Sequence, residues 1–264
     1  MYNFTYHRPG SVDEAASLIA DNEDAKLLAG GMTLLPTMKQ RLAMPSDLVD
    51  LNEIGGLSGI SVDGGTVTIG ATTRHADVAA SADVQSAIPA LAALAGQIGD
   101  PAVRNRGTIG GSLANADPAA DYPAAIVGLG ATIVTNSREI SGDDFFVDMF
   151  ETALDEGEII TAVRFPVPQK ASYFKFPNPA SRYPIVGVMV AQTDSGVRVA
   201  VTGAGPSAFR VPEMEQALSS NFSADAVEGI SVPADGLNED MHASAAFRAS
   251  LVTVGAKRAV AEIA

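Results

Sequence analysis

A helical repeat of apolar residues marks the segment 11–22, close to the start of the chain. Ser11 is followed three residues later by Glu14, a spacing typical of the capping box that begins a helix. The apolar positions that share one face of this helix are Val12, Ala15, Ala16 and Ile19. The pattern therefore predicts an amphipathic helix in this segment.

Short apolar runs flank this helix on both sides. An extended segment precedes it at 4–9, and a buried strand follows it at 25–31 and runs into a glycine turn. The segment 32–42 has a helical pattern that Pro36 interrupts early, and 45–51 has the pattern of a strand. The sequence therefore predicts a compact β-α-β-α-β unit that ends near residue 52.

A different pattern begins after this unit. Apolar and polar residues alternate between 59 and 73 on both sides of Asp63-Gly64-Gly65, which is a hairpin signal. The elements expected next are a helix at 86–99, a glycine-rich loop at 104–117, a helix leading into a strand within 121–136, and a strand at 156–168. Prolines close this part of the chain near Pro168.

The remaining residues predict strands followed by helices. The strands are expected at 172–176, 184–193 and 197–205, and the helices at 212–219 and 247–263. Together the patterns predict an α+β fold in two domains, residues 1–168 and 169–264. The first domain is expected to consist of two subdomains, about 1–53 and 54–168.

Composition narrows the function classes. The chain is 47% hydrophobic, which predicts a globular protein. Its net charge of -14 produces a negative electrostatic field that opposes the binding of nucleic acid and anionic lipid. It has no cysteine, which excludes disulfides, a thiol nucleophile and cysteine-ligated metal on this chain. No apolar run approaches the roughly 20 residues of a membrane span, and the start lacks the features of a signal peptide. A cytoplasmic protein is expected.

The first candidate site is the turn Ala29-Gly30-Gly31-Met32-Thr33. Paired glycines after a buried strand let the backbone approach a ligand closely, and successive N–H groups at a helix start can hold a phosphate. The hydroxyl of Thr33 adds a donor. The alternative is a tight strand-to-helix turn that binds nothing.

The second candidate site is the segment from Arg104 to Asn115, with three glycines, two hydroxyl residues and asparagines. Asp121 follows it, and a carboxylate there could accept hydrogen bonds from a sugar hydroxyl. Loops of this length commonly bind ligands, although a structural role is the alternative.

Other motifs are weaker. Gly203-Ala204-Gly205 opens a G-x-G-x-x-A pattern, but Pro206 follows where a helix would have to begin, so a simple turn is expected. The three histidines, His7, His75 and His242, lack the spacing of metal ligands. Any chemistry would therefore be supplied by a bound cofactor.

The two glycine segments together resemble the FAD-binding medium subunit of carbon monoxide dehydrogenases and the flavin domain of xanthine dehydrogenases, both molybdenum hydroxylases. The similar segments are 29–51, 103–133, 144–168, 173–188 and 247–263, which span nearly the whole chain. The resemblance implies a two-subdomain FAD-binding domain of the vanillyl-alcohol-oxidase type, followed by a smaller α+β domain.

The resemblance also implies which residues bind FAD. Gly30, Gly31 and Thr33 would lie at the centre of the turn that holds the diphosphate, and Asp121 would contact the ribityl or ribose side. Leu94 and Ile160 would pack against the flavin or adenine. The full set of implied cofactor-binding residues is Leu27, Leu28, Ala29, Gly30, Gly31, Met32, Thr33, Leu34, Leu94, Thr108, Ile109, Gly110, Gly111, Ser112, Asp121, Ile160, Lys175 and Tyr183.

Some residues depart from the pattern of that family. Met32 stands where a polar residue is frequent, and Ser112 replaces the commoner asparagine. Pro177 and Asn178 follow Lys175 where basic residues are usual, so the surroundings of the flavin ring are expected to differ here.

In such assemblies a large subunit holds the molybdenum cofactor, a small subunit holds 2Fe-2S clusters, and the FAD passes electrons to an external acceptor. The resemblance therefore implies a heterotrimer, or a dimer of heterotrimers. A stand-alone flavin oxidoreductase and a non-catalytic nucleotide-binding subunit remain the alternatives. The substrate and the acceptor are open at this point.

Overall fold

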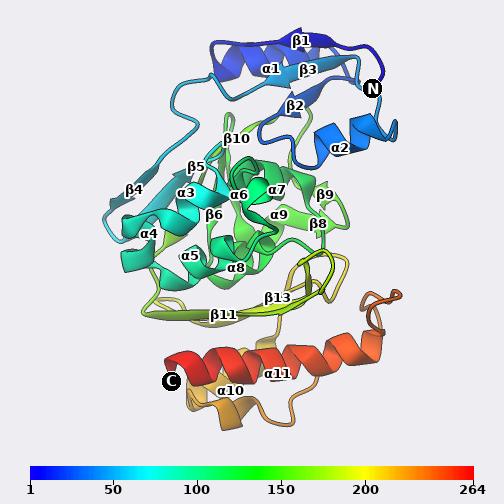
Figure 1. Cartoon of the computed structure of the whole chain (residues 1–264). Coiled ribbons are helices and arrows are strands. Elements are labelled where there is room, and N and C mark those ends of the chain that lie inside the picture. Colours follow the sequence, from blue (N-terminus) through cyan, green and yellow to red (C-terminus); the bar gives the residue numbers. More distant parts are fainter.

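The computed structural model describes all 264 residues and places them in layers that follow one another along the molecule (Figure 1). The N-terminal sheet and its helices form one end of the molecule, and the long C-terminal helix forms the other. Three separate hydrophobic cores hold these layers together.

The N-terminal layer is the predicted β-α-β-α-β unit. Its elements are β1 (Thr5–His7), α1 (Val12–Ala20), β2 (Lys26–Leu28), α2 (Leu34–Lys39) and β3 (Asp47–Asp50). The strands are parallel, in the order β1-β3-β2. The side chain of Ser11 accepts from the Glu14 N–H, as expected of a helix cap.

Pro36 does not interrupt its helix, so that expectation is wrong. It lies in the first turn of α2, where backbone N–H groups have no intrahelical partner. A proline there therefore removes no helical hydrogen bond.

The middle layer is a five-stranded antiparallel sheet that carries most of the helices. The hairpin of β4 (Ile60–Asp63) and β5 (Thr66–Gly70) turns at Gly64 and Gly65, which both have positive φ angles. The sheet order is β4-β5-β10-β6-β7, completed by β6 (Thr132–Thr135), β7 (Glu139–Ser141) and β10 (Ile160–Pro166). A separate hairpin pairs β8 (Phe146–Asp148) with β9 (Glu151–Thr152).

The helices of this layer are α3 (His75–Ala80), α4 (Ala82–Ala87), α5 (Pro89–Gly96), α6 (Pro101–Arg104), α7 (Ile109–Asn115), α8 (Tyr122–Gly128) and α9 (Gly142–Phe145). Two expectations were wrong here. The helix expected over 86–99 begins only at Pro89, because Ile88 precedes a proline and leaves the helical region. The glycine-rich segment is no loop, since most of it forms α6 and α7.

The C-terminal layer is a four-stranded antiparallel sheet of β11 (Lys170–Pro177), β12 (Pro184–Thr193), β13 (Gly196–Thr202) and β14 (Phe209–Arg210). The helices α10 (Pro212–Ser220) and α11 (Ala245–Ile263) and a 3-10 turn (Ala224–Val227) cover its outer face (Figure 1). Residues of its inner face, such as Met189, join the core of the middle layer. No helix in this structure has both the length and the apolar character needed to cross a membrane.

Candidate functional site

The two glycine segments, far apart in the chain, touch at Gly30. A Cβ atom there would overlap the main-chain carbonyl oxygen of Arg106 and lie 2.8 Å from the Cα of Gly107. Only glycine allows the backbones to approach this closely. Asn52, just after β3, secures the first turn, because its side-chain amide donates to the Ala29 carbonyl at 2.8 Å.

The first glycine turn presents a row of free backbone donors. None of the six consecutive N–H groups from Ala29 to Leu34 donates to an acceptor within the chain, and the next, that of Leu35, donates to the Gly31 carbonyl. Gly31 turns the chain with a φ of 70°, in the left-handed region that favours glycine. Such a row, leading into the start of α2, suits a phosphate group.

The second glycine segment uses its N–H groups differently. Those of Ile109 and Gly110 donate to the carbonyls of Thr73 and Ala71, at 3.1 and 2.8 Å. Those of Gly111 and Ser112 donate to Thr108, whose side chain caps α7. The N–H groups of four of the implied cofactor-binding residues, 109–112, are therefore not free to bind a ligand, because the segment begins a helix. The Thr108 N–H and the Ser112 hydroxyl remain without an acceptor.

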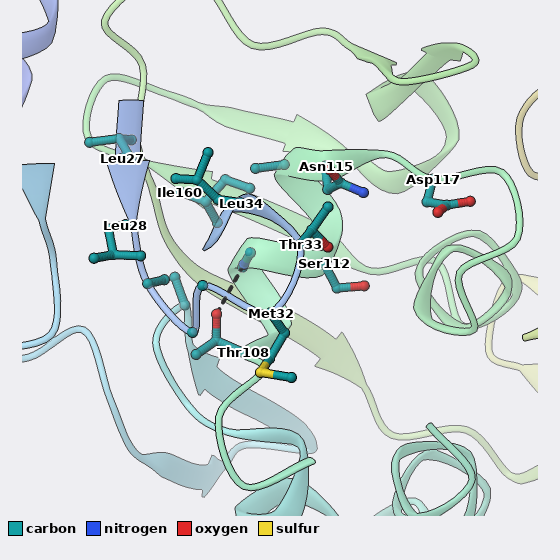
Figure 2. Close-up of a pocket in the computed structure, with 18 of the residues that line it drawn as sticks. Leu27, Leu28, Met32, Thr33, Leu34, Thr108, Ser112, Asn115, Asp117 and Ile160 are labelled. Carbon is teal, nitrogen blue, oxygen red and sulfur yellow. Dashed lines mark hydrogen bonds between the residues drawn. The ribbon is translucent and has the colours of Figure 1, made fainter. Parts of the chain in front are cut away.

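A cavity of about 750 Å³ lies between the two segments. Figure 2 shows Leu27, Leu28, Leu34 and Ile160 toward one end of this cavity, and Asn115 and Asp117 toward the other. The sequence-predicted residues that line it are Leu27, Leu28, Ala29, Gly30, Gly31, Met32, Thr33, Leu34, Thr108, Gly110, Gly111, Ser112, Asp121, Ile160 and Tyr183. The structure therefore brings most of the predicted set together.

Three predicted residues do not line the cavity. Leu94, in the middle of α5, and Ile109, in the first turn of α7, are fully buried in the core of the middle layer. Lys175 on β11 is also buried, and its side chain reaches the cavity wall only through Asp121. Apolar character alone did not distinguish a core residue from a lining residue at positions 94 and 109.

Asp121 lies at the centre of a buried network. Its carboxylate accepts from the Tyr173 hydroxyl at 2.8 Å and forms an ion pair with the Lys175 ammonium at 2.9 Å. Lys175 also donates to the Gln97 carbonyl at 2.9 Å. Burial raises the pKa of Asp121 to about 6, although Lys175 and Tyr173 act in the opposite direction. The carboxylate thus joins α8 to β11 and also faces the cavity.

His75 lines the cavity; the sequence allowed such a role after Thr72 and Thr73 but favoured a surface or helix-start histidine. It begins α3, is 5% exposed, and its ring lies 5.4 Å from that of Tyr122. Burial, with a smaller contribution from Arg104, lowers the pKa of His75 to about 4, so the ring is neutral near pH 7. The signal that could have identified it is its place after the buried pair Thr72 and Thr73.

Other lining residues were also missed, because they come from segments without a motif. They lie in the loop after α1, at the start of α6, in the segment after β9 and in the turn after β11: Asn22, Asp100, Val103, Glu156, Glu158 and Arg182. Glu158 is held by Arg138, whose hydrogen bond lowers the pKa of that carboxyl to about 2.

The weaker motifs are the turn at Gly203 and the histidines. The turn at Gly203 leaves β13 and enters β14, with no helix before Pro212, so it is no dinucleotide fingerprint. His7 pairs with Asp47 at 2.6 Å, far along the chain from the other histidines. No group of three or more His, Cys, Asp or Glu side chains is placed to hold a metal ion.

The arrangement suits a dinucleotide with a diphosphate. Free N–H groups can bind the diphosphate, apolar side chains can cover a ring, and the cavity has the size of a cofactor site. Residues 2–168 match the family of the FAD binding domain in molybdopterin dehydrogenase. The chain belongs to this family. This membership confirms the prediction that the chain is an FAD-carrying oxidoreductase subunit with the α+β fold of that family.

Relatives cover nearly the whole chain. The chain is 36% identical to the carbon monoxide dehydrogenase medium chain of Hydrogenophaga pseudoflava, covering 97% of this chain and 96% of that one. It is 36% identical to the nicotine 6-hydroxylase medium subunit of Paenarthrobacter nicotinovorans, with the same coverage.

Solved structures agree with these relatives. Carbon monoxide dehydrogenase from Hydrogenophaga pseudoflava superposes with a TM-score of 0.89 at 37% identity, covering 98% of this chain and 96% of that one. Quinoline 2-oxidoreductase from Pseudomonas putida 86 superposes with a TM-score of 0.89 at 30% identity, covering 99% and 96%.

Proposed function

We propose that this chain is the FAD-carrying electron-transfer subunit of a molybdenum hydroxylase. It takes electrons from the 2Fe-2S clusters of a small partner subunit and passes them to an external acceptor. A large partner subunit holds the molybdenum cofactor and oxidises the substrate. The assembly is a heterotrimer that forms a dimer of heterotrimers in the cytoplasm.

The observation that carries the proposal is the row of free N–H groups in a chain without acid–base machinery. The six donors from Ala29 to Leu34 lie in the wall of a cavity of dinucleotide size. The chain has no cysteine, so it cannot hold clusters that would supply electrons to a flavin. The relatives are named as medium chains and medium subunits, which supports a complex with partner subunits that hold such clusters.

Each side chain of the site has a specific role in this proposal. The turn around Gly30, Gly31 and Thr33 binds the diphosphate, and the Thr108 N–H and the Ser112 hydroxyl add donors. Asp121 accepts from a sugar hydroxyl with the lone pairs that Tyr173 and Lys175 leave free.

The remaining lining residues position the rings. Leu27, Leu28 and Ile160 cover one ring. Tyr183 lies beside the other. Lys175 acts through Asp121, and Leu94 and Ile109 support the wall from the core. Residues 1–168 form the FAD-binding domain and residues 169–264 the second domain.

When bound, FAD supplies a carrier that accepts and releases electrons, while the chain binds it and shields it from water. No lining residues form an acid–base pair for an organic substrate: His75 makes no hydrogen bond to a carboxylate, and Asp121 is already paired with Lys175. The isolated subunit should therefore bind FAD and be reduced by dithionite, but it should not be reduced by organic substrates.

Anaerobic spectroscopy of the flavin band tests the proposal. The full chain is mixed with candidate substrates such as aldehydes, purines or N-heterocycles, first alone and then with the cluster and molybdenum subunits. Bleaching only with the partners supports the proposal. Bleaching of the isolated chain would make it a stand-alone flavin oxidoreductase, and a chain that binds no FAD would be a non-catalytic subunit.

A further inference from the structure

The segment between α7 and α8, residues 117–121, is held in place by the C-terminal sheet. The hydroxyl of Thr202 on β13 is fully buried and lies within hydrogen-bonding distance of the carbonyls of Ala120 and Pro118, at 2.6 and 3.2 Å. Asp121, at the end of this segment, faces the first cavity. The C-terminal sheet therefore fixes the main chain from which the Asp121 carboxylate reaches the cavity.

Tyr173 on β11 holds the carboxylate itself. Its side chain is buried, and its hydroxyl donates to Oδ1 of Asp121 at 2.8 Å. Lys175, two residues further on, projects from the same face of the strand and pairs with the same carboxylate at 2.9 Å. Residues 2–168 are the part of the chain that matches the FAD-binding family, so both contacts come from outside it.

Gly187 on β12 makes room for the Tyr173 hydroxyl. It is the partner of Lys175 in the sheet register, and a Cβ atom there would overlap the hydroxyl oxygen and lie 2.8 Å from the Thr202 methyl group. Gly187 lines neither of the two largest cavities. Three neighbouring strands thus determine where the Tyr173 hydroxyl lies.

Tyr122 shows that burial alone does not produce such a contact. It follows Asp121 directly in the chain and is fully buried, yet its hydroxyl has no hydrogen-bond partner. The Tyr173 hydroxyl, in contrast, is directed at the carboxylate. A hydrogen bond of this kind restricts the rotation of the carboxylate and favours its ionised form.

The titratable groups around Asp121 come from three places in the fold. Tyr173 and Lys175 lie on β11, Tyr122 on α8, and Tyr183 in the turn after β11. Burial raises the pKa of Asp121 to about 6, and the contacts with Lys175 and Tyr173 lower it. Burial also raises the pKa of each of the three tyrosines. Among the carboxyl group and these hydroxyls, the carboxyl is therefore the one that changes its protonation near neutral pH.

We propose that Tyr173 is a positioning residue of the cofactor site, which holds the Asp121 carboxylate in the orientation that accepts from a sugar hydroxyl of FAD. The proposal rests on the proposed function, since it requires FAD in the first cavity. Tyr173 lines no part of that cavity and acts only through Asp121. The second domain thereby takes part in cofactor binding through a side chain that does not touch the cofactor.

Titration of the full chain with FAD at pH values from 5 to 8.5 tests the proposal. Tyr173→Phe removes the hydroxyl that binds the carboxylate. Tyr122→Phe is the matched control, because it removes a hydroxyl without a partner from an equally buried ring. Gly187→Ala is a second test variant, since its Cβ displaces the Tyr173 hydroxyl from outside the cavity. Circular dichroism of each chain without FAD checks that it is folded.

The sugar hydroxyl binds the ionised carboxylate, so the affinity of the original chain for FAD should fall as the pH drops through the pKa of Asp121. In Tyr173→Phe this fall should begin about one pH unit higher, and the Kd at pH 7 should rise about fivefold. Gly187→Ala should shift the profile in the same direction, and Tyr122→Phe should bind FAD like the original chain.

An unchanged pH profile in a folded Tyr173→Phe variant would overturn the inference. A loss of affinity by the same factor at every pH would also overturn it, because a purely structural role has that effect. If Tyr173→Phe does not fold, Gly187→Ala decides by the same criterion. An original chain that binds no FAD would instead overturn the proposed function.

Discussion

Gly30 lies directly against the main-chain carbonyl of Arg106, so the two glycine segments meet backbone to backbone. This contact places the free N–H groups of the first turn beside the N-terminus of α7. It depends on one missing Cβ atom, which makes Gly30 a sensitive position for both folding and cofactor binding.

Gly30→Ala should therefore destabilise the protein and weaken FAD binding together. The added Cβ forces the two backbones apart, and overpacking of this kind costs about 1–3 kcal/mol. Gly55→Ala is the matched control, because a Cβ at that position would meet nothing within 4 Å. Thermal unfolding and FAD titration of both variants check the expectation, and a Gly30→Ala variant as stable as Gly55→Ala would contradict it.

Gly31→Val should separate cofactor binding from folding. Gly31 has a φ of 70°, and a side chain there would also meet Leu28 and Leu35 at 2.9–3.0 Å. The turn must change shape to relieve this, and two lost bonds to the diphosphate would reduce the affinity for FAD about 100-fold. Gly56→Val carries comparable strain at a φ of 84° but in open space. Equal FAD affinity in these two folded variants would disprove the role of the first turn.

Removing one partner of the buried ion pair between Asp121 and Lys175 should destabilise the protein. Asp121→Asn leaves a buried ammonium without its carboxylate, which costs about 3–5 kcal/mol of unfolding free energy. The double variant Asp121→Asn with Lys175→Met should recover part of this loss. Loss of the carboxylate should also weaken the binding of FAD, by on the order of 1–3 kcal/mol. Denaturant unfolding and FAD titration measure both effects, and an unchanged dissociation constant would limit Asp121 to a structural role.

The contribution of His75 to the unfolding free energy should fall as the pH drops below about 6.5, because its ring is buried in the neutral form, whereas the raised pKa of Asp121 acts in the opposite direction. The pKa of His75 is about 4 in the folded chain against an ordinary 6.5, so the unfolded chain binds more protons between these values. The loss should reach up to about 3 kcal/mol by pH 4. His75→Phe should remove this contribution, so that its unfolding free energy rises relative to that of the original chain as the pH falls from 6.5 to 4, whereas His242→Phe, at an exposed position, should show no such trend. Identical pH profiles for His75→Phe and the original chain would contradict the assignment.

The sequence by itself determined the order of the elements and the nature of the first glycine turn. The helix after Ser11, the hairpin at Gly64 and Gly65 and the long strand at 184–193 follow from local periodicity and turn chemistry, and all three are present. Gly31 was recognised because glycine, which has no Cβ, tolerates the positive φ that the turn requires. The two glycine segments together also identified the family.

Only the tertiary structure decided how those elements meet. The contact of Gly30 with Arg106 and the pairing of Asp121 with Lys175 join residues that are distant in the chain, and no local pattern encodes them. The same holds for Leu94, which packs in a core that several layers build together. Whether an N–H at a helix start binds a ligand or a neighbouring carbonyl depends on what the fold brings beside it. For this reason the N–H of Gly110 is engaged by Ala71, while that of Gly30 remains free.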